Sequence, residues 1–179
     1  MDVLKLMLKQ RGMNVELTQA IVEPTYQGEI VKIDKAVVYT SGRARISEKD
    51  ISKIISMTEK NGGTLSIVIV PIPASSTILA TVRQESKRIQ IFHTGQLQFD
   101  IFTHRKVPPH RILNEEERKK LQDTYHIEFP ATQMPLIDSQ DAAAKWVGAV
   151  PGDILEILRK SDTAGTTPYY RYCVADTSL

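Results

Sequence analysis

The stretch Leu65-Ser66-Ile67-Val68-Ile69-Val70 decides the fold of the N-terminal half of the chain. Its β-branched residues favour extended backbone, so we expect it to form a central strand of a sheet. Residues 36–39 form another short apolar run, which suits a buried strand, and residues 89–92 predict a third strand. These three segments define the expected centre of one sheet.

Helices are predicted between these strands. Ser47 begins the clearest one, because its hydroxyl can accept from free backbone amides and Asp50 stands three residues on, at the capping-box position. Residues 61–63, Asn-Gly-Gly, end this helix, and Ser75 or Ser76 begins the next. The side chains expected to face inward from the two helices are Ile51, Ile54, Ile55, Ile78, Leu79 and Val82. Strands that alternate with helices indicate an α/β layer.

Other N-terminal segments give weaker patterns. A short helix is expected over residues 3–8, with Gly12 as its C-cap, and residues 14–35 predict no particular element. Residues 96–102 alternate apolar and polar side chains, which predicts a half-buried strand.

The C-terminal part has the pattern of a small α+β domain. Asn114 predicts the cap of a charged helix, whose acidic residues precede its basic ones as the helix dipole favours. The further expected elements are a helix over residues 139–147 that stops at Gly148, strands over 154–158 and 169–174, and a loop over 160–168. We therefore predict an N-terminal α/β domain over residues 1–103, with a central sheet, and an α+β domain over residues 104–179.

The charge of the chain is nearly balanced. It has 179 residues, of which 23 are basic and 21 acidic, for a net charge of +2, which argues against a protein that holds nucleic acid by itself. Residues 1–103 hold 13 basic and 10 acidic residues, whereas residues 104–179 hold 10 and 11. The N-terminal half is therefore the one expected to face phosphates.

Several classes of site find no support in the sequence. Cys173 is the single cysteine, which excludes an intrachain disulfide, and we expect it to be a small buried residue. The four histidines, at 93, 104, 110 and 126, lack a standard zinc spacing, so we expect no metal and no other cofactor. The longest apolar stretch, residues 67–74, is too short to span a bilayer. The N-terminus carries no apolar signal core, so an intracellular protein with no membrane partner and no small-molecule ligand is expected.

A metal-dependent nuclease is the best enzymatic alternative. Such a site needs converging carboxylates and a nearby lysine, and residues 85–87 read Glu-Ser-Lys. However, this segment ends a predicted helix, and the central strand over residues 65–70 carries no acid. The sequence therefore favours a protein without a catalytic site of its own.

A cluster of cations precedes and enters the predicted helix at Ser47. Arg43 and Arg45 stand in a turn-like stretch, and Lys49 and Lys53 follow on the helix. Four cations in eleven residues can meet a few phosphates, although a solvated face has the same composition.

An ordered series of landmarks distinguishes the C-terminal half. They are His104, Val107-Pro108, His110, Met134-Pro135-Leu136-Ile137, Asp141, Gly148, Gly152-Asp153, residues 159–165 (Arg-Lys-Ser-Asp-Thr-Ala-Gly) and Tyr170-Arg171. The series closely resembles the shared subunit five of eukaryotic nuclear RNA polymerases and the corresponding archaeal polymerase subunit, which consists of this domain alone. The family's Asp-Pro pair is Asp141-Ala142 here, and the arginine three residues on is Lys145.

The N-terminal half is similar to the jaw domain of the eukaryotic subunit. Residues 6–12 resemble its opening helix and Arg-Gly turn. The strand over residues 65–70, followed by Pro73-Ala74-Ser75, resembles its strand and Thr-Pro-Ser-Ala element, with Ile72 in place of the threonine.

The resemblance implies a non-catalytic subunit of a multisubunit DNA-directed RNA polymerase. The C-terminal domain is expected to dock on the largest subunit, beside other core subunits, and the N-terminal domain to form part of the lower jaw near downstream duplex DNA. The residues expected at the subunit interface are His104, Val107, Pro108, His110, Trp146, Gly152, Asp153, Arg159, Ser161, Thr163, Gly165 and Arg171. Those expected near DNA are Arg43, Arg45, Lys49, Lys53, Pro73 and Ser75.

The roles of Trp146 and of residues 159–165 stay open at this point. Trp146 suits either the core or an interface anchor, and the segment over residues 159–165 suits either strand connection or partner contact. Arg171 is expected to pair with an acid within its own domain.

A free-standing adaptor that binds transcription regulators through the same fold is the alternative function. The expected location is the nucleus in a eukaryotic cell, and the host cytoplasm or virion if the chain is viral.

Overall fold

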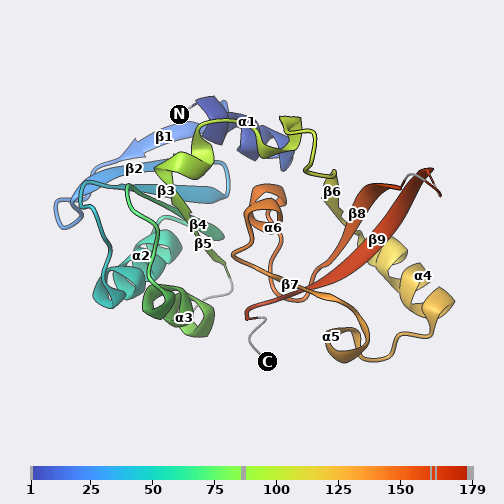
Figure 1. Ribbon diagram of the computed structural model, residues 1–179. Helices are drawn as coiled ribbons and strands as arrows, with labels where there is room; N and C mark the ends of the chain where they lie inside the picture. The colour runs from blue at the N-terminus through green and yellow to red at the C-terminus, as the bar shows by residue number, and fades with distance from the viewer. Residues whose placement is uncertain (1, 86–87, 162, 164, 177–179) are drawn as a thin grey trace. The chain divides into compact units, whose positions relative to one another are not determined.

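A computed structural model describes residues 2–85, 88–161, 163 and 165–176. The chain divides into two compact units, Met1–Asp100 and Ile101–Leu179 (Figure 1). Both contain helices and a mixed sheet, so the predicted α/β class is confirmed. None of the helices in the described ranges is long and apolar enough to cross a membrane.

The N-terminal unit is built on a five-stranded sheet with the order β1-β2-β3-β4-β5. Its strands are β1 (Thr18–Ile21), β2 (Gly28–Ile33), β3 (Ala36–Ser41), β4 (Leu65–Val70) and β5 (Ile89–His93). The first three strands pair antiparallel, whereas β3 pairs with β4 and β4 with β5 in parallel. The stretch over residues 65–70 is therefore a central strand, as predicted, and all but one of its residues are buried. Burial on both faces explains its continuous apolar run.

Helices cover both faces of this sheet. The helices are α1 (Asp2–Gln10), α2 (Glu48–Lys60) and α3 (Ser76–Glu85), and Figure 1 shows α1 on the opposite side from α2 and α3. The inner sides of α2 and α3 pack on Val37, Tyr39 and Val68 of the sheet. The predicted start of α2 is confirmed, because the backbone N–H of Ser47 donates to Asp50 Oδ2 at 2.9 Å.

Two expectations for the N-terminal unit were wrong. Residues 14–35, for which no element was predicted, contain β1 and β2; β1 is an edge strand in which no residue is buried. The strand expected over residues 96–102 does not form: the chain makes two 3₁₀ turns, η1 (Thr94–Leu97) and η2 (Ile101–Thr103). The side chain of Gln96 accepts from the backbone N–H of His93 at 3.3 Å, which starts the first turn.

The C-terminal unit has a four-stranded sheet with the order β6-β8-β9-β7. Its strands are β6 (His110–Ile112), β7 (Leu136–Asp138), β8 (Ile154–Ser161) and β9 (Gly165–Val174), and its helices are α4 (Glu115–Tyr125), α5 (Pro130–Gln133) and α6 (Ala142–Val147). The predicted caps of α4 and α6 are confirmed: Asn114 accepts from the N–H of Glu117, and Gly148 ends α6 in the left-handed region with φ of 84°. However, α6 begins only at Ala142, after Asp141 as its N-cap.

The loop expected over residues 160–168 is mostly strand. The ladder of β8 and β9 continues through Arg159↔Thr167 and Lys160↔Thr166 to Ser161↔Gly165, which makes a long hairpin. Sequence reasoning shortened both strands because their distal residues are polar. These residues pair with each other beyond the reach of the short edge strands β6 and β7.

Candidate interaction surfaces

The six residues expected near DNA gather at one edge of the N-terminal sheet. Arg43 and Arg45 follow the end of β3, and Pro73 and Ser75 follow the end of β4. Because β3 and β4 are parallel, their carboxyl ends meet at the same edge, where α/β sheets commonly place their binding sites. Lys49 and Lys53 extend the cluster onto exposed positions of α2, one helical turn apart.

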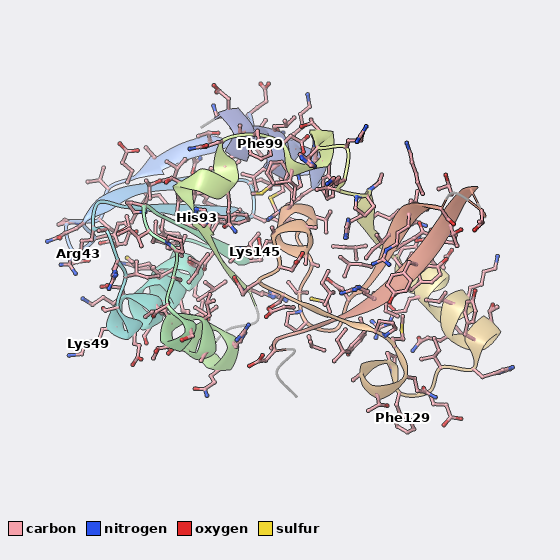
Figure 2. All side chains as sticks on the ribbon, in the orientation of Figure 1. Arg43, Lys49, His93, Phe99, Phe129 and Lys145 are labelled. Carbon is pink, nitrogen blue, oxygen red and sulfur yellow. The ribbon has the colours of Figure 1, made fainter. Side chains whose placement is uncertain are left out.

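Two adjoining hollows mark this edge. A cavity of about 500 Å³ is lined by both Arg43 and Lys53, and a cavity of about 270 Å³ by Arg45, Pro73 and Ser75, with Ile46 lining both. Figure 2 shows the side chains of Arg43 and Lys49 directed away from the sheet. The structure thus brings five of the six residues to two neighbouring hollows and leaves Lys49 on the outer surface of α2.

Residues within the N-terminal unit bind part of the Arg43 guanidinium group. The Nε of Arg43 donates to Gln27 Oε1 at 2.7 Å, and its Nη1 lies 4.0 Å from Asp50 Oδ2. Burial is the largest single influence on the pKa of Asp50 and raises it. The hydrogen bonds from Ser47 and the charges of Arg43 and Lys53 together outweigh burial and lower the pKa, so this acid stays ionised beside the cluster. The edge is therefore mixed in charge, which suits weak attraction to phosphates.

The residues expected at the subunit interface fall into separate places. Gly152 and Asp153 form the turn that precedes β8, where Asp153 Oδ2 accepts from the N–H of Val150 at 2.8 Å. Ser161 ends β8 and Gly165 begins β9 at the other end of the hairpin, with Thr163 between them in the sequence. Since the eight residues of β8 span roughly 25 Å, these two ends of the hairpin cannot belong to one compact site. They can contribute to one interface only if it runs along the hairpin.

One face of the C-terminal sheet collects several predicted residues. Register places His110 opposite Ile157, Ile157 opposite Tyr169, and Arg159 opposite Thr167, so His110, Arg159 and Arg171 share a face. The guanidinium carbon of Arg159 lies 4.2 Å from the centroid of the Tyr169 ring, and that of Arg171 lies 5.6 Å from the same centroid. Tyr169 is a member of this group that sequence reasoning missed; its two-residue spacing from Arg171 along a strand was the available signal.

The expected pairing of Arg171 with an acid is wrong for the described residues. Its Nη1 donates to the backbone carbonyl of Leu136 at 3.1 Å, and its Nε is buried without an acceptor. The side chain therefore connects β9 to the start of β7 and lies beside Tyr169 rather than beside a carboxylate.

Trp146 is a core residue, which settles the first open question. It is 1 % exposed, and its ring meets Phe102 edge to face with centroids 6.4 Å apart. His110 packs against the same Phe102, and its Nδ1 bonds the carbonyl of Pro108 at 2.7 Å. Burial lowers the pKa of His110, so this imidazole is neutral near pH 7. Trp146 is therefore unable to anchor a partner from the surface, whereas His104 is exposed and Val107 and Pro108 are partly so.

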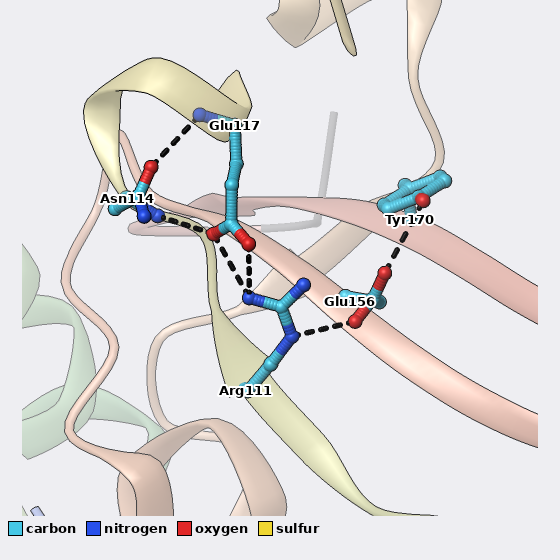
Figure 3. Close-up of polar contacts among 5 residues, drawn as sticks. All are labelled: Arg111, Asn114, Glu117, Glu156 and Tyr170. Carbon is cyan, nitrogen blue, oxygen red and sulfur yellow. Dashed lines mark hydrogen bonds and ion pairs between the residues drawn. The ribbon is translucent and has the colours of Figure 1, made fainter. Parts of the chain in front are cut away.

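An unpredicted network of charges lies on the other face of the sheet. Arg111 donates to Glu156 Oε2 at 2.6 Å and to both carboxylate oxygens of Glu117 at 2.8 Å (Figure 3). Tyr170 donates to the second oxygen of Glu156 at 3.2 Å, and Asn114 caps α4 beside Glu117. The network connects β6, β8, β9 and α4, so it fixes the helix on the sheet.

The metal-ligand and thiol groups of the described residues were the candidates for a catalytic site. No three His, Cys, Asp or Glu side chains in the described ranges are arranged to hold a metal ion. Cys173 is fully buried, as predicted, and burial raises the pKa of its thiol to about 12, which suits an inert core residue. Of the alternative nuclease segment, Ser86 and Lys87 lie outside the described residues, as do Asp162 and Ala164 of the interface loop.

Comparison with known proteins identifies the family. The family model described as RNA polymerase Rpb5, C-terminal domain, matches residues 99–173. The DNA-directed RNA polymerase subunit Rpo5 of Pyrococcus abyssi is 55% identical over 82 residues, which are 46% of this chain and 98% of that protein. The corresponding protein of Methanosarcina mazei is 43% identical over 77 residues, 43% of this chain and 96% of its own length. The chain therefore belongs to the Rpb5/Rpo5 family of DNA-directed RNA polymerase subunits.

A eukaryotic relative extends the match into the N-terminal unit. The DNA-directed RNA polymerases I, II, and III subunit rpabc1 of Dictyostelium discoideum is 28% identical over 145 residues, which are 79% of this chain and 73% of that protein. An alignment of this length extends beyond the C-terminal unit, whereas the archaeal relatives match less than half of the chain. The resemblance to a polymerase subunit, stated from the sequence, is confirmed.

Proposed function

We propose that this chain is a non-catalytic polymerase subunit whose C-terminal unit docks on the largest subunit and whose N-terminal unit forms part of the lower jaw near downstream DNA. The observation that carries the proposal is the 55% identity to an archaeal Rpo5 that the chain covers almost completely. The matching region coincides with the C-terminal unit. A unit retained at this identity across its whole length is the natural candidate for assembly.

Charge supports the division of labour between the two units. The C-terminal unit has a net charge of −1, whereas the N-terminal unit has a net charge of +3, so the N-terminal unit is the better suited of the two to lie beside duplex phosphates. Four of the N-terminal cations, Arg43, Arg45, Lys49 and Lys53, gather at the carboxyl edge of the sheet, with two hollows beside them. A weak, mixed-charge surface of this kind is sufficient for a unit that a larger assembly holds beside the DNA.

Co-purification tests the assembly part of the proposal. The tagged full chain, expressed in its own organism or with the other polymerase subunits, is expected to recover two very large subunits in stoichiometric amounts. Recovery without them would instead support the free-standing adaptor. The location of the chain then follows that of the polymerase, which is the nucleus in a eukaryotic cell.

Cross-linking of downstream DNA tests the jaw part. We expect Arg43→Glu/Arg45→Glu to weaken cross-links between the assembled chain and downstream duplex, because it reverses two charges in the cluster at the carboxyl edge. Lys9→Glu/Lys35→Glu is the matched control, since both lysines are exposed on the same unit and lie outside this cluster. Equal cross-linking by the two double variants and the native chain would contradict the jaw assignment.

A further inference from the structure

The edge strand β1 leaves one side of its backbone open. It pairs with β2, and just before it the N–H of Asp34 donates to the carbonyl of Leu17 at 3.2 Å. Bonded and non-bonded residues alternate along an antiparallel pair, so Thr18 and Ala20 direct their N–H and C=O groups away from β2. Among the residues that the structure describes, these outward groups have no backbone partner. The first three residues of β1 are also exposed, so the edge is accessible.

The sequence of this edge lacks the usual protection against pairing with another chain. Proteins commonly guard an open edge with a lysine, a proline or a bulge. Residues 17–22 read Leu-Thr-Gln-Ala-Ile-Val and contain no charge and no proline, and the register with β2 is regular. Two apolar side chains stand in solvent at the ends of this stretch, since Leu17 is 58 % exposed and Val22 is 91 % exposed. An uncharged edge with apolar ends is suited to pairing with a further strand.

We propose that β1 pairs antiparallel with β1 of a second copy of this chain, so that one sheet continues across both copies. The inference concerns the chain outside the polymerase and does not depend on the proposed function. A twofold axis at Ala20 aligns the outward backbone groups of the two strands. It also places Thr18 of one copy opposite Val22 of the other, and such β-branched cross-strand pairs stabilise a sheet.

The charges around the edge are compatible with a second copy. In the register centred on Ala20, Glu23 lies opposite Leu17 of the other copy, and its carboxylate has Lys60 Nζ at 3.4 Å within its own copy. Glu16 lies opposite Pro24, so no acid faces an acid. The net charge of +2 per chain adds only a weak repulsion, which salt screens.

The small size of the contact determines how strong the dimer is. β1 has four residues, so pairing of two such strands buries far less than the area of about 1,000 Å² that stable interfaces exceed. The dimer is therefore weak and forms only where the free chain is concentrated.

Two charge variants test both the pairing and its register. Thr18→Lys/Val22→Lys places like charges opposite each other across the twofold axis, whereas Thr18→Lys/Val22→Glu places opposite charges there. Both sites are exposed, so the variants should keep the fold, which circular dichroism checks. Sedimentation velocity of the purified full chain, from micromolar to near-millimolar concentration, gives the dissociation constant of the dimer. We expect the first variant to weaken dimerisation at least about tenfold, and the second to dimerise as the native chain does or more tightly.

Three results would overturn the proposal: a native chain that stays monomeric at every concentration, equal dissociation constants for the three proteins, or equal weakening by both variants. A photo-crosslinking amino acid at position 22 identifies the occupant in cells. A cross-link between two copies of this chain supports the proposal, and a cross-link to a different protein contradicts it. None of these outcomes changes the recovery of the large polymerase subunits, which tests the proposed function separately.

Discussion

The two units of this chain bury their sheets in different ways. In the N-terminal unit, α2 and α3 pack on one face of a five-stranded sheet and share one large apolar cluster with it, while α1 buries Leu4, Met7 and Leu8 on the opposite side. In the C-terminal unit, the apolar residues form separate small clusters, one around Leu155 and Cys173 and another around Leu113 and Ile154. A small divided core has fewer contacts to spare, so single buried residues there should matter more. Three predictions test this difference.

The largest effect is expected from Trp146→Ala. The side chain is 1 % exposed and contacts Phe102, so its loss leaves a cavity and should lower the free energy of unfolding by about 3–5 kcal/mol. Urea denaturation followed by circular dichroism measures the change. Trp146→Phe is the control, because it keeps an aromatic ring in the same place and should cost clearly less. A loss below about 1 kcal/mol for the alanine variant would break the comparison, because it would show that the small core tolerates a large deletion.

Lys145 should give the C-terminal unit a distinctive pH dependence. The side chain is 4 % exposed, and burial lowers its pKa from 10.5 to about 8. Between these two values the unfolded chain binds more protons at this site than the folded chain does, so stability must rise as pH increases. From pH 7 to pH 9.5, the native chain should gain up to roughly 2 kcal/mol relative to Lys145→Met.

Urea midpoints of both proteins at pH 7, 8, 9 and 9.5 measure this difference. The Met variant serves as the internal reference, because all other titrating groups are common to the two chains. A difference that stays constant over this range would show that Lys145 is not held in a low-dielectric site.

The smallest effect is expected in the N-terminal unit, from Tyr39→Phe. The Tyr39 hydroxyl lies 2.8 Å from Thr58 Oγ1, which also donates to the carbonyl of Ile54 and bonds Ser66. Removal of the hydroxyl leaves the Thr58 bonds in place and should cost about 1 kcal/mol. Thr58→Val should cost more, because it removes the partner that Tyr39 and Ser66 share.

The single tryptophan makes this last test specific for a unit. Trp146 lies in the C-terminal unit, so its fluorescence reports that unit, whereas circular dichroism reports both. Tyr39→Phe should shift the circular dichroism transition more than the fluorescence transition. Equal shifts by both probes would show that the two units unfold together.

The sequence predicted the elements whose burial is strong and missed those whose burial is weak. The central strands and the caps at Ser47, Asn114 and Gly148 follow from local chemistry, and the structure confirms them. The edge strand over residues 18–21 has no apolar face to detect, and the distal half of β8 is polar. The false strand over residues 96–102 shows the opposite error: Phe99, on its expected inner face, is 55 % exposed, so alternation alone does not report burial.

The candidate surfaces could be predicted only in part. The residues near the carboxyl edge come together because β3 and β4 are parallel, an arrangement the alternating pattern suggested. The proximity of Arg159, Tyr169 and Arg171 depends on the register between β8 and β9, which no local pattern specifies once the distal residues of these strands have been taken for a loop. The family resemblance identified Arg159 and Arg171 but gave no reason for their proximity; the shared contact with Tyr169 supplies it.

The long β8–β9 hairpin has a consequence for solubility before assembly. Beyond Leu158 on one side and Tyr172 on the other, the two strands make no further backbone hydrogen bonds to β6 or β7 in the described part of the chain, so both edges are open templates for aggregation. Two residues at these edges counter that hazard: Lys160 places an exposed charge on β8, and Pro168 removes a backbone donor from β9. The hairpin can therefore stay extended and available to a partner while it resists self-association.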